Sequence, residues 1–382
     1  MAIERPSAPI GINGRFLMSW GRETAGVHRA AWNWLLALVR EAPAGRRFVV
    51  ATGRTPENEA ALAELEALGS VELLLSPIPR RRGGTHVWEQ LRLGPLLQKS
   101  GCAVMANLAN TMPLRPRMRS LLAVMDTSFM ERAAWFRLGF RAWYSVLVPS
   151  LLRRADRIVT ISEFSRREIL RRFPILPEKV EVVGLGADHA HPAASETGRE
   201  NEPGWAPPGV PYILYLGSIE PRKNIPLLIE AFRRLKRRAP DLPHRLVLAG
   251  GTARIFRKER FAGVEGVQFT GYLPESQLPA FYRGADLFVF PSRYEGFGLP
   301  PLEAMAAGVA TLVARAGALP ETAGNGADLF DPDSPDELAF AMERLLRDSK
   351  ARAALAERGR KRAAGFRWQE AGRRLNRILD LL

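Results

Sequence analysis

The chain has 382 residues, 46% of them hydrophobic and 25% charged, which is the composition of a globular protein with room for two domains. Its 55 Lys and Arg against 40 Asp and Glu give a net charge of +15, of which +10 falls in the first 190 residues. A single cysteine, Cys102, and five scattered histidines exclude an intrachain disulfide framework and a zinc site with closely spaced ligands.

The excess of positive charge does not distinguish between several classes of anionic partner. An anionic membrane, a polyanionic acceptor and nucleic acid would all be attracted, and arginines on solvated faces explain the same excess without a partner. The sequence contains no apolar run of about eighteen residues and no signal-peptide core. We therefore expect a cytoplasmic protein, in the reducing compartment that suits one free cysteine.

Short apolar runs alternate with amphipathic stretches through the first half of the chain, which favours a parallel α/β fold. The expected strands are Ile10–Asn13, Phe48–Ala51, Val71–Leu75, Ala103–Ala106, Leu121–Val124 and Arg157–Ile161. The expected helices are Ala30–Arg40, Asn58–Leu68 and one that Ser162 caps and Pro174 stops. A Pro- and Gly-rich stretch then follows, which is typical of a linker between domains.

The alternation restarts after this linker. The expected strands are Tyr212–Leu216, Arg245–Ala249, Val267–Thr270, Leu287–Phe290 and Ala310–Ala314, and the expected helices are Pro226–Arg237, Leu278–Gly284, Asp336–Arg347, Lys350–Ala364 and Trp368–Leu382. The fold class is therefore predicted to be α/β, with two doubly wound Rossmann-like domains. Their predicted bounds are 1–190 and 212–366, with a linker at 191–211 and a C-terminal helix at 367–382.

The most informative segment is Pro291–Gly308, which follows a strand-like apolar run. Two prolines begin a short helix there, and Gly308 can close it. Glu295 is therefore expected in a Gly-rich loop at the carboxyl end of a strand, and Glu303 in the first turn of the next helix. That edge of an open α/β sheet binds ligands. Free helix N–H groups attract phosphate, and carboxylates accept hydrogen bonds from sugar hydroxyls.

Two further strand-to-helix turns carry matching chemistry. Gly217 directly follows a strand, and the adjacent cations Arg222 and Lys223 precede a helix that begins near Pro226. Glu321 lies at the start of another helix. Each turn alone is explained by a solvated loop or a helix-terminal acid. All three fall on the carboxyl edge of one sheet, however, and together they predict a nucleotide-sugar site.

These segments resemble the retaining glycosyltransferases of the GT-B fold, family 4 (glycosyltransferase group 1), of a mannosyltransferase-like kind. The resemblance is strongest over 212–332, where the two glutamates lie in a Tyr-Glu-Gly-Phe-Gly-Leu-Pro-Pro-Leu-Glu context. It is looser at Gly26–Arg29, Asp126–Phe129 and Ile161–Ser165. The resemblance implies two Rossmann-like domains facing across a cleft, with the C-terminal helix crossing back to the first domain.

The resemblance also implies a role for each matching residue. Arg222 and Lys223 would bind the donor diphosphate and stabilise it as the leaving group, Glu303 would bind the ribose hydroxyls, and Glu295 would face the donor sugar. The implied catalytic residues are Asp126, Arg222, Lys223 and Glu295, with Asp126 meeting an acceptor hydroxyl. The implied donor-binding residues are Gly26, Gly217, Arg222, Lys223, Tyr272, Leu273, Glu295, Gly296, Phe297, Gly298, Leu299 and Glu303.

Two departures concern the first domain. Many relatives have a histidine where this chain has Met125, so that either an imidazole is missing or His28 takes its place. The loop at Gly26 is also less rich in glycine than is common in the family. The resemblance implies no metal ligand, and no cofactor apart from the nucleotide-sugar co-substrate.

The implied function is the transfer of a hexose, with retention, to a saccharide or polyprenyl-linked saccharide in bacterial polysaccharide biosynthesis. The Glu220–Asn224 loop favours GDP-mannose, and UDP-glucose and dTDP-rhamnose remain open. Peripheral contact with the inner face of the plasma membrane is expected, and nucleic acid is not an expected partner. A basic membrane-binding or nucleic-acid-binding protein without activity is the alternative class.

Two other enzymatic interpretations explain less of the sequence. A glycosidase would use Glu295 and Glu303 as its carboxylate pair, which leaves Arg222 and Lys223 unexplained. A GT-B epimerase or phosphorylase lacks support from a histidine context or a lysine-anchored cofactor motif.

Five tryptophans are expected to pack in the core, namely Trp32, Trp34, Trp135, Trp143 and Trp368. The aromatic stretch from Trp135 to Tyr144, with interleaved arginines, has a second interpretation as an amphipathic helix that faces a membrane.

Overall fold

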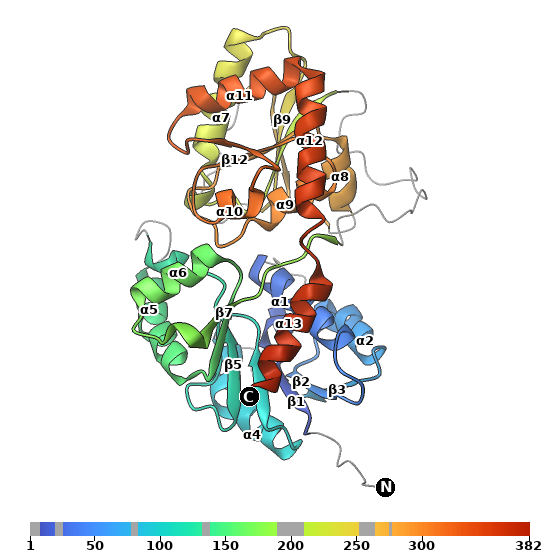
Figure 1. The fold of residues 1–382 in the computed structure, drawn as a ribbon, viewed down its shortest axis with the longest axis vertical. Helices are drawn as coiled ribbons and strands as arrows, with labels where there is room; N and C mark the ends of the chain where they lie inside the picture. The colour runs from blue at the N-terminus through green and yellow to red at the C-terminus, as the bar shows by residue number, and fades with distance from the viewer. Residues whose placement is uncertain are drawn as a thin grey trace. The chain divides into compact units, whose positions relative to one another are not determined.

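The computed structural model divides the chain into two compact units, each an open parallel β-sheet with helices packed against it (Figure 1). Unit 1 comprises Met1–Gly186 and Trp368–Leu382, and unit 2 comprises Ala187–Arg367. The structure describes residues 8–19, 26–77, 83–131, 138–188, 210–251, 264–274 and 277–382. All but the last two positions of the predicted linker lie outside these ranges.

Unit 1 is built on seven parallel strands in the order β3-β2-β1-β4-β5-β6-β7. They are β1 (Ile10–Asn13), β2 (Phe48–Thr52), β3 (Val71–Leu75), β4 (Val104–Asn107), β5 (Arg119–Ala123), β6 (Arg157–Thr160) and β7 (Val180–Val182). The six predicted strands are confirmed to within two residues, whereas the short edge strand β7 was not predicted. The chain leaves β1 toward β2 and β3 and returns on the other side at β4, so the order reverses between β1 and β4.

The helices of unit 1 bury their apolar stripes against this sheet and against each other. They are α1 (Gly26–Arg40), α2 (Glu59–Glu66), α3 (Gly84–Trp88), α4 (Gly94–Lys99), α5 (Leu138–Arg154), α6 (Glu163–Arg172) and α13 (Trp368–Asp380). The C-terminal helix α13 packs along α1 (Figure 1), where the Asn376 side chain donates to the Leu38 carbonyl at 2.9 Å. The last helix therefore belongs to the core of unit 1.

Unit 2 repeats the plan with six parallel strands in the order β10-β9-β8-β11-β12-β13. They are β8 (Tyr212–Leu216), β9 (Arg245–Ala249), β10 (Val267–Gly271), β11 (Leu287–Phe290), β12 (Thr311–Ala314) and β13 (Asp328–Phe330). The five predicted strands are confirmed to within one residue, and β13 was not predicted. The strand order here reverses between β8 and β11.

The helices of unit 2 include the short one predicted from two prolines. They are α7 (Ile225–Arg238), α8 (Leu278–Gly284), α9 (Leu299–Ala306), α10 (Leu319–Ala323), α11 (Pro335–Arg347) and α12 (Ser349–Ala363). Helix α9 ends as expected, because Gly308 has a φ of +77° and its N–H donates to the Met305 carbonyl at 3.0 Å.

The tryptophans follow the core prediction with one exception. Trp32, Trp34 and Trp368 are buried, whereas the prediction for Trp143 is wrong, because this side chain is 55% exposed. The buried face of α5 consists of Leu147, Val148, Leu151 and Leu152. Trp143 lies off that face, and Trp135 lies outside the described residues.

Candidate functional site

Three strand-to-helix turns meet where the sheet of unit 2 reverses its order. They follow β8, β11 and β12, and these strands are direct neighbours, because β11 pairs with both β8 and β12. In parallel strands all carboxyl ends lie on one edge, so the prediction of three such turns on one edge is confirmed. A reversal of strand order is the place where open α/β sheets hold their ligands.

Four charged side chains gather there, and we call them the charged cluster: Glu220, Arg222, Lys223 and Glu295. The Lys223 ammonium lies 2.6 Å from Glu295 Oε1, and Arg222 Nη1 lies 3.0 Å from the same oxygen. Arg222 Nε lies 2.6 Å from Glu220 Oε1. Lys223 and Glu295 are both more than nine-tenths buried. Two cations and two carboxylates thus balance each other in a largely dry site.

Backbone hydrogen bonds fix the turn after β8 to the turn after β11. The Arg293 N–H donates to the Arg222 carbonyl at 2.8 Å, and Arg222 Nη1 donates to the Tyr294 carbonyl at 3.2 Å. The turn after β12 holds the same loop from the other side, because the Ala318 N–H donates to the Glu295 carbonyl at 2.9 Å. Glu295 is therefore held on both flanks by its neighbours in the sheet.

The surroundings of Glu295 determine its ionisation. Burial would raise its pKa, but the charges of Arg222 and Lys223 outweigh burial and hold the pKa below its usual value. Burial and the neighbouring Arg222 lower the pKa of Lys223, and Glu295 opposes that shift. Glu295 is thus an ionised carboxylate at neutral pH, which accepts hydrogen bonds and has no proton to give.

The glycine predicted after β8 is required by the protein itself. Gly217 has a φ of +154°, and a Cβ at this position would lie 2.8 Å from the Tyr215 hydroxyl. That hydroxyl donates to the Ser218 carbonyl at 2.9 Å, which fixes the start of the loop. The glycine therefore lets the loop fold back over Tyr215, and its proposed contact with a ligand stays a prediction.

The start of α9 offers fewer backbone donors than the sequence suggested. Gly298 is the N-cap residue and Leu299 the first helical residue, and the next two residues, Pro300 and Pro301, have no N–H. The Leu302 N–H is spent on the Gly298 carbonyl at 3.3 Å. An anion at this edge would therefore depend mainly on the side chains of Arg222 and Lys223.

Glu303 lies deeper than predicted. It is the fifth residue of α9, in the second turn rather than the first, and its side chain is fully buried. Its Oε2 accepts the hydroxyl of Tyr282 from α8 at 2.9 Å. Tyr282 was not predicted as a site residue, because nothing in the sequence connects α8 with α9.

The remaining predicted donor residues divide into two places. Gly296 and Phe297 continue the Glu295 loop, and the Thr322 hydroxyl donates to the Phe297 carbonyl at 2.6 Å. Tyr272 and Leu273 follow the edge strand β10, which is two strands away from β8. The Tyr272 side chain is 57% exposed, whereas Leu273 is buried.

The predicted site residues of unit 1 do not form a cluster like that of unit 2. Asp126 uses Oδ1 to accept the Ser128 N–H at 2.9 Å, and a Cβ at Gly26, the first residue of α1, would meet open space. Met125 is buried. Burial, with the nearby charge of Arg15, lowers the pKa of His28. Roles for Asp126, Gly26 and His28 stay predictions.

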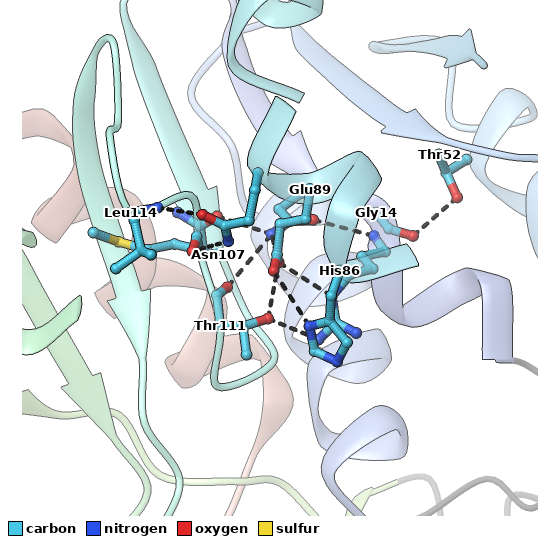
Figure 2. Close-up of polar contacts among 11 residues, drawn as sticks. Gly14, Thr52, His86, Glu89, Asn107, Thr111 and Leu114 are labelled. Carbon is cyan, nitrogen blue, oxygen red and sulfur yellow. Dashed lines mark hydrogen bonds and ion pairs between the residues drawn. The ribbon is translucent and has the colours of Figure 1, made fainter. Parts of the chain in front are cut away.

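A polar group at the sheet edge of unit 1 was missed by the sequence prediction. We call it the Glu89 cluster: Asn13, Arg15, Glu89, Asn107 and Thr111. Asn13 ends β1 and Asn107 ends β4, the two strands between which the order reverses. Figure 2 shows Asn107 and Thr111 close to Glu89. A polar residue at the end of an apolar strand was the available signal in the sequence.

Two classes of feature are not found among the described ranges of the chain. In those ranges, no group of three His, Cys, Asp or Glu side chains is arranged to hold a metal ion. None of the helices that the structure describes combines the length and the apolar character needed to cross a membrane.

Two family models match the chain in succession. The model for Glycosyltransferase Family 4 matches residues 25–191, and the model for Glycosyl transferases group 1 matches residues 199–362. The chain is 32% identical over 228 residues to the O-antigen chain mannosyltransferase B of Escherichia coli, a match that covers 57% of this chain and 58% of that protein. This chain thus spans little more than half of that relative.

A second relative is the D-inositol 3-phosphate glycosyltransferase of Corynebacterium kroppenstedtii, 30% identical over 311 residues, with 78% of this chain and 66% of that protein covered. Among solved structures, sucrose-phosphate synthase from Thermosynechococcus elongatus is similar with a TM-score of 0.72 at 21% identity, covering 98% of both chains. HepE from Anabaena, solved with UDP and glucose, has a TM-score of 0.67 at 17% identity, covering 98% of this chain and all of that one. These likenesses show the GT-B fold.

Proposed function

Because the chain belongs to the group 1 glycosyltransferases of the GT-B fold, we propose that it transfers a hexose from a nucleotide sugar to a saccharide hydroxyl, with retention of configuration. The observation that carries this proposal is the buried pairing of Lys223 and Arg222 with Glu295 at the reversal point of the sheet in unit 2. The pairing joins two phosphate-binding cations to a carboxylate that can hold sugar hydroxyls.

The charged cluster supports an exchange of partners when the donor binds. Without a ligand, Glu295 neutralises Lys223 and Arg222. A donor diphosphate competes for the same two cations, and their transfer to phosphate releases the Glu295 carboxylate to accept from the sugar. The two cations then stabilise the charge that develops on the diphosphate as the sugar leaves.

The ionisation of Glu295 argues against hydrolysis by a carboxylate pair. A glycosidase needs one carboxyl group with a raised pKa as a proton donor. Here Arg222 and Lys223 lower the pKa of Glu295. Glu303, the other candidate, is closed off from solvent on α9 and accepts a hydrogen bond from Tyr282. Neither arrangement suits a general acid.

We propose mannose from GDP-mannose as the donor. This proposal is supported by the similarity to the Escherichia coli relative, which is a mannosyltransferase. UDP-glucose is the competing donor, because the HepE structure holds UDP and glucose on the same fold. The third candidate donor is dTDP-rhamnose.

The proposed acceptor is a saccharide or a polyprenyl-linked saccharide in bacterial polysaccharide biosynthesis. An O-antigen chain enzyme among the relatives supports this class. A lipid-linked acceptor would require contact with the inner face of the plasma membrane. The exposed Trp143 and Val146 of α5, and the exposed Arg153 and Arg154 at its C-terminal end, offer apolar and basic side chains for this contact.

A thermal-shift screen of the full chain against GDP, UDP, dTDP and ADP tests the donor proposal. We expect the largest rise in melting temperature with GDP, and no rise for a variant with Arg222→Ala and Lys223→Ala. The competing interpretation, a basic binding protein without activity, predicts a response to any polyanion that collapses steeply with salt. The absence of a shift with all four nucleotides at low salt would contradict the enzymatic proposal.

A further inference from the structure

The Glu89 cluster lies where the sheet of unit 1 reverses its strand order, which is the position that the charged cluster occupies in the sheet of unit 2. Asn13 and Asn107 end the two strands between which the order reverses, and the neighbouring polar atoms belong to Arg15, Glu89 and Thr111. A reversal point at the carboxyl edge is where doubly wound sheets bind ligands. The four uncharged or acidic members are all more than nine-tenths buried.

The hydrogen bonds to Glu89 are strongly asymmetric. Its Oε1 accepts from Asn13 Nδ2 at 2.7 Å, from Thr111 Oγ1 at 2.8 Å and from Arg15 Nε at 3.1 Å. Its Oε2 is buried and has no hydrogen-bond donor among the described residues. A buried carboxylate oxygen without a donor costs free energy, so this atom is suited to receive one.

His86 is the side chain placed to donate a hydrogen bond to the unpaired Oε2 of Glu89. Its Nδ1 lies 3.9 Å from Glu89 Oε2 (Figure 2), too far for a hydrogen bond but close enough that a small rotation of the ring would form one. The Glu89 side chain is 1% exposed and that of His86 is 36% exposed. A ligand in solvent would therefore meet the pair at His86.

The charges around the pair favour a neutral ligand. Arg15 is already engaged, because its Nε lies on Glu89 and its Nη2 donates to the Thr111 hydroxyl at 2.7 Å. Burial and the charge of Arg15 lower the pKa of His86, although Glu89 opposes them, so this imidazole is uncharged at neutral pH. The open carboxylate oxygen and the neutral imidazole offer hydrogen-bond partners to hydroxyl groups, and they add no positive charge that would hold a phosphate, because Glu89 already neutralises Arg15.

The helix that carries both residues is deformed at Glu89. The stretch Glu89–Leu93 forms a π-helical turn between α3 and α4. Pro95 lies just beyond it and lacks the N–H that a regular helix would use there, which accounts for the wider turn. Such turns frequently occur at functional sites.

We propose that His86 and Glu89 form a subsite for a hydroxyl group of a neutral, non-phosphorylated saccharide acceptor, an inference that rests on the proposed function. The hydroxyl donates to His86 Nε2, and His86 Nδ1–H turns onto Glu89 Oε2. His86 then contacts the ligand directly, and Glu89 is the positioning residue. The subsite thereby selects neutral sugars over sugar phosphates as acceptors.

Ligand-observed NMR titration of the full chain tests this proposal with two probes, methyl α-D-mannopyranoside and mannose 6-phosphate. The wild type is expected to bind the neutral glycoside more tightly. Glu89→Gln should weaken that binding roughly tenfold to hundredfold, as expected for loss of a hydrogen bond to a charged group, and His86→Ala should weaken it at least as much, because it removes both the contact with the ligand and the link to Glu89. Glu89→Gln should also shift the preference toward mannose 6-phosphate, which a merely structural role would not do.

Controls separate this proposal from the proposed function. Glu66→Gln removes an exposed carboxylate of unit 1 and should change neither affinity. Nucleotide binding, measured by thermal shift, should be unchanged in His86→Ala, whose side chain is 36% exposed and belongs to unit 1. No binding of the methyl glycoside to the wild type, tighter binding of the phosphate, or unchanged affinity in His86→Ala would each overturn the subsite and leave the donor site untouched.

Discussion

The ammonium of Lys223 and the carboxylate of Glu295 lie 2.6 Å apart, although 72 positions separate them in the chain. The contact exists because β8 and β11 are neighbours in the sheet, so that the turns that follow them meet. Each residue is the other's counter-ion in the absence of a ligand. Under the proposed function, the donor diphosphate competes with Glu295 for Lys223.

Replacement of Glu295 should therefore have opposite effects on nucleotide binding and on transfer. Glu295→Gln removes the competitor for Lys223 and Arg222, so we expect the affinity for GDP to rise, by roughly tenfold if the competing pair costs about 1.4 kcal/mol. Sugar transfer should fall, because the amide cannot replace the carboxylate at the sugar. Isothermal titration calorimetry and a transfer assay measure the two effects.

The matched control for this variant is Glu357→Gln, which removes an exposed carboxylate of α12 in the same unit. It should leave both quantities unchanged. A fall in GDP affinity for Glu295→Gln would contradict the exchange of partners, because it would mean that Glu295 helps to bind the nucleotide.

The ion pair should also make stability depend on pH in a defined direction. Glu295 has a folded-state pKa below its usual 4.5, so the pair stabilises the fold fully above 4.5 and loses this contribution as the pH falls through the lowered pKa. Urea unfolding from about pH 7 to about pH 3 should show a steeper loss of unfolding free energy for the wild type than for Glu295→Gln. Parallel curves would refute the assignment.

Tyr282→Phe tests the support of Glu303. The hydroxyl of Tyr282 donates to Glu303 Oε2 inside the protein, and its loss should lower the free energy of unfolding by about 1 to 3 kcal/mol. If Glu303 binds the donor ribose, KM for the donor should rise with little change in kcat. Tyr272→Phe, which removes an exposed hydroxyl, is the control for stability. An unchanged KM in Tyr282→Phe would separate Glu303 from donor binding.

The placement of Arg222, Lys223, Glu295 and Glu303 on one sheet edge of unit 2 could be predicted because these residues come in short contiguous segments. Arg222 and Lys223 are adjacent, and Glu295 and Glu303 share one strand-loop-helix segment. The partners of these residues could not be predicted. Whether Glu295 faces solvent or Lys223 depends on how two loops pack, and Tyr282 reaches Glu303 from another helix. Local patterns identify elements, whereas pairings between elements depend on sheet order.

Unit 1 shows the opposite case. Its strands follow from apolar runs, but the Glu89 cluster joins residues up to 98 positions apart without any shared motif. Asn13 and Asn107 each have a local explanation as the last residue of a strand. Only the adjacency of β1 and β4 brings them together. The exposure of Trp143 could likewise not be predicted from the amino-acid composition of its segment, because it depends on which face of α5 packs into the core.

Trp143 gives a test of the proposed membrane contact. Its side chain and that of Val146 are 55% and 71% exposed on α5. Insertion of a tryptophan into an apolar phase contributes about 1.5 to 3 kcal/mol, so Trp143→Ala should reduce binding to phosphatidylglycerol vesicles by roughly tenfold or more. Co-sedimentation measures the effect. Phe340→Ala, which removes an exposed aromatic side chain of unit 2, should bind like the wild type.

Gly317 tests whether the backbone of the Glu295 loop must stay in place for transfer. It has a φ of +60°, and a Cβ there would lie 2.6 Å from the Glu295 carbonyl oxygen and 2.7 Å from its nitrogen. Gly317→Ala therefore adds a clash to the cost of about 1 to 2 kcal/mol for the left-handed conformation. Gly45→Ala, at a φ of +80° with open space around it, carries only the conformational cost.

In both variants the left-handed backbone should lower the free energy of unfolding by a similar amount. Gly317→Ala should lower it further because of the clash. Only Gly317→Ala should displace Glu295, so its transfer rate should fall at least tenfold while Gly45→Ala stays near the wild type. Transfer assays at a temperature where both variants are folded measure this difference. Equal rates in the two variants would show that the clash is relieved by movement of Gly317 alone, and that the position of Glu295 does not depend on the turn after β12.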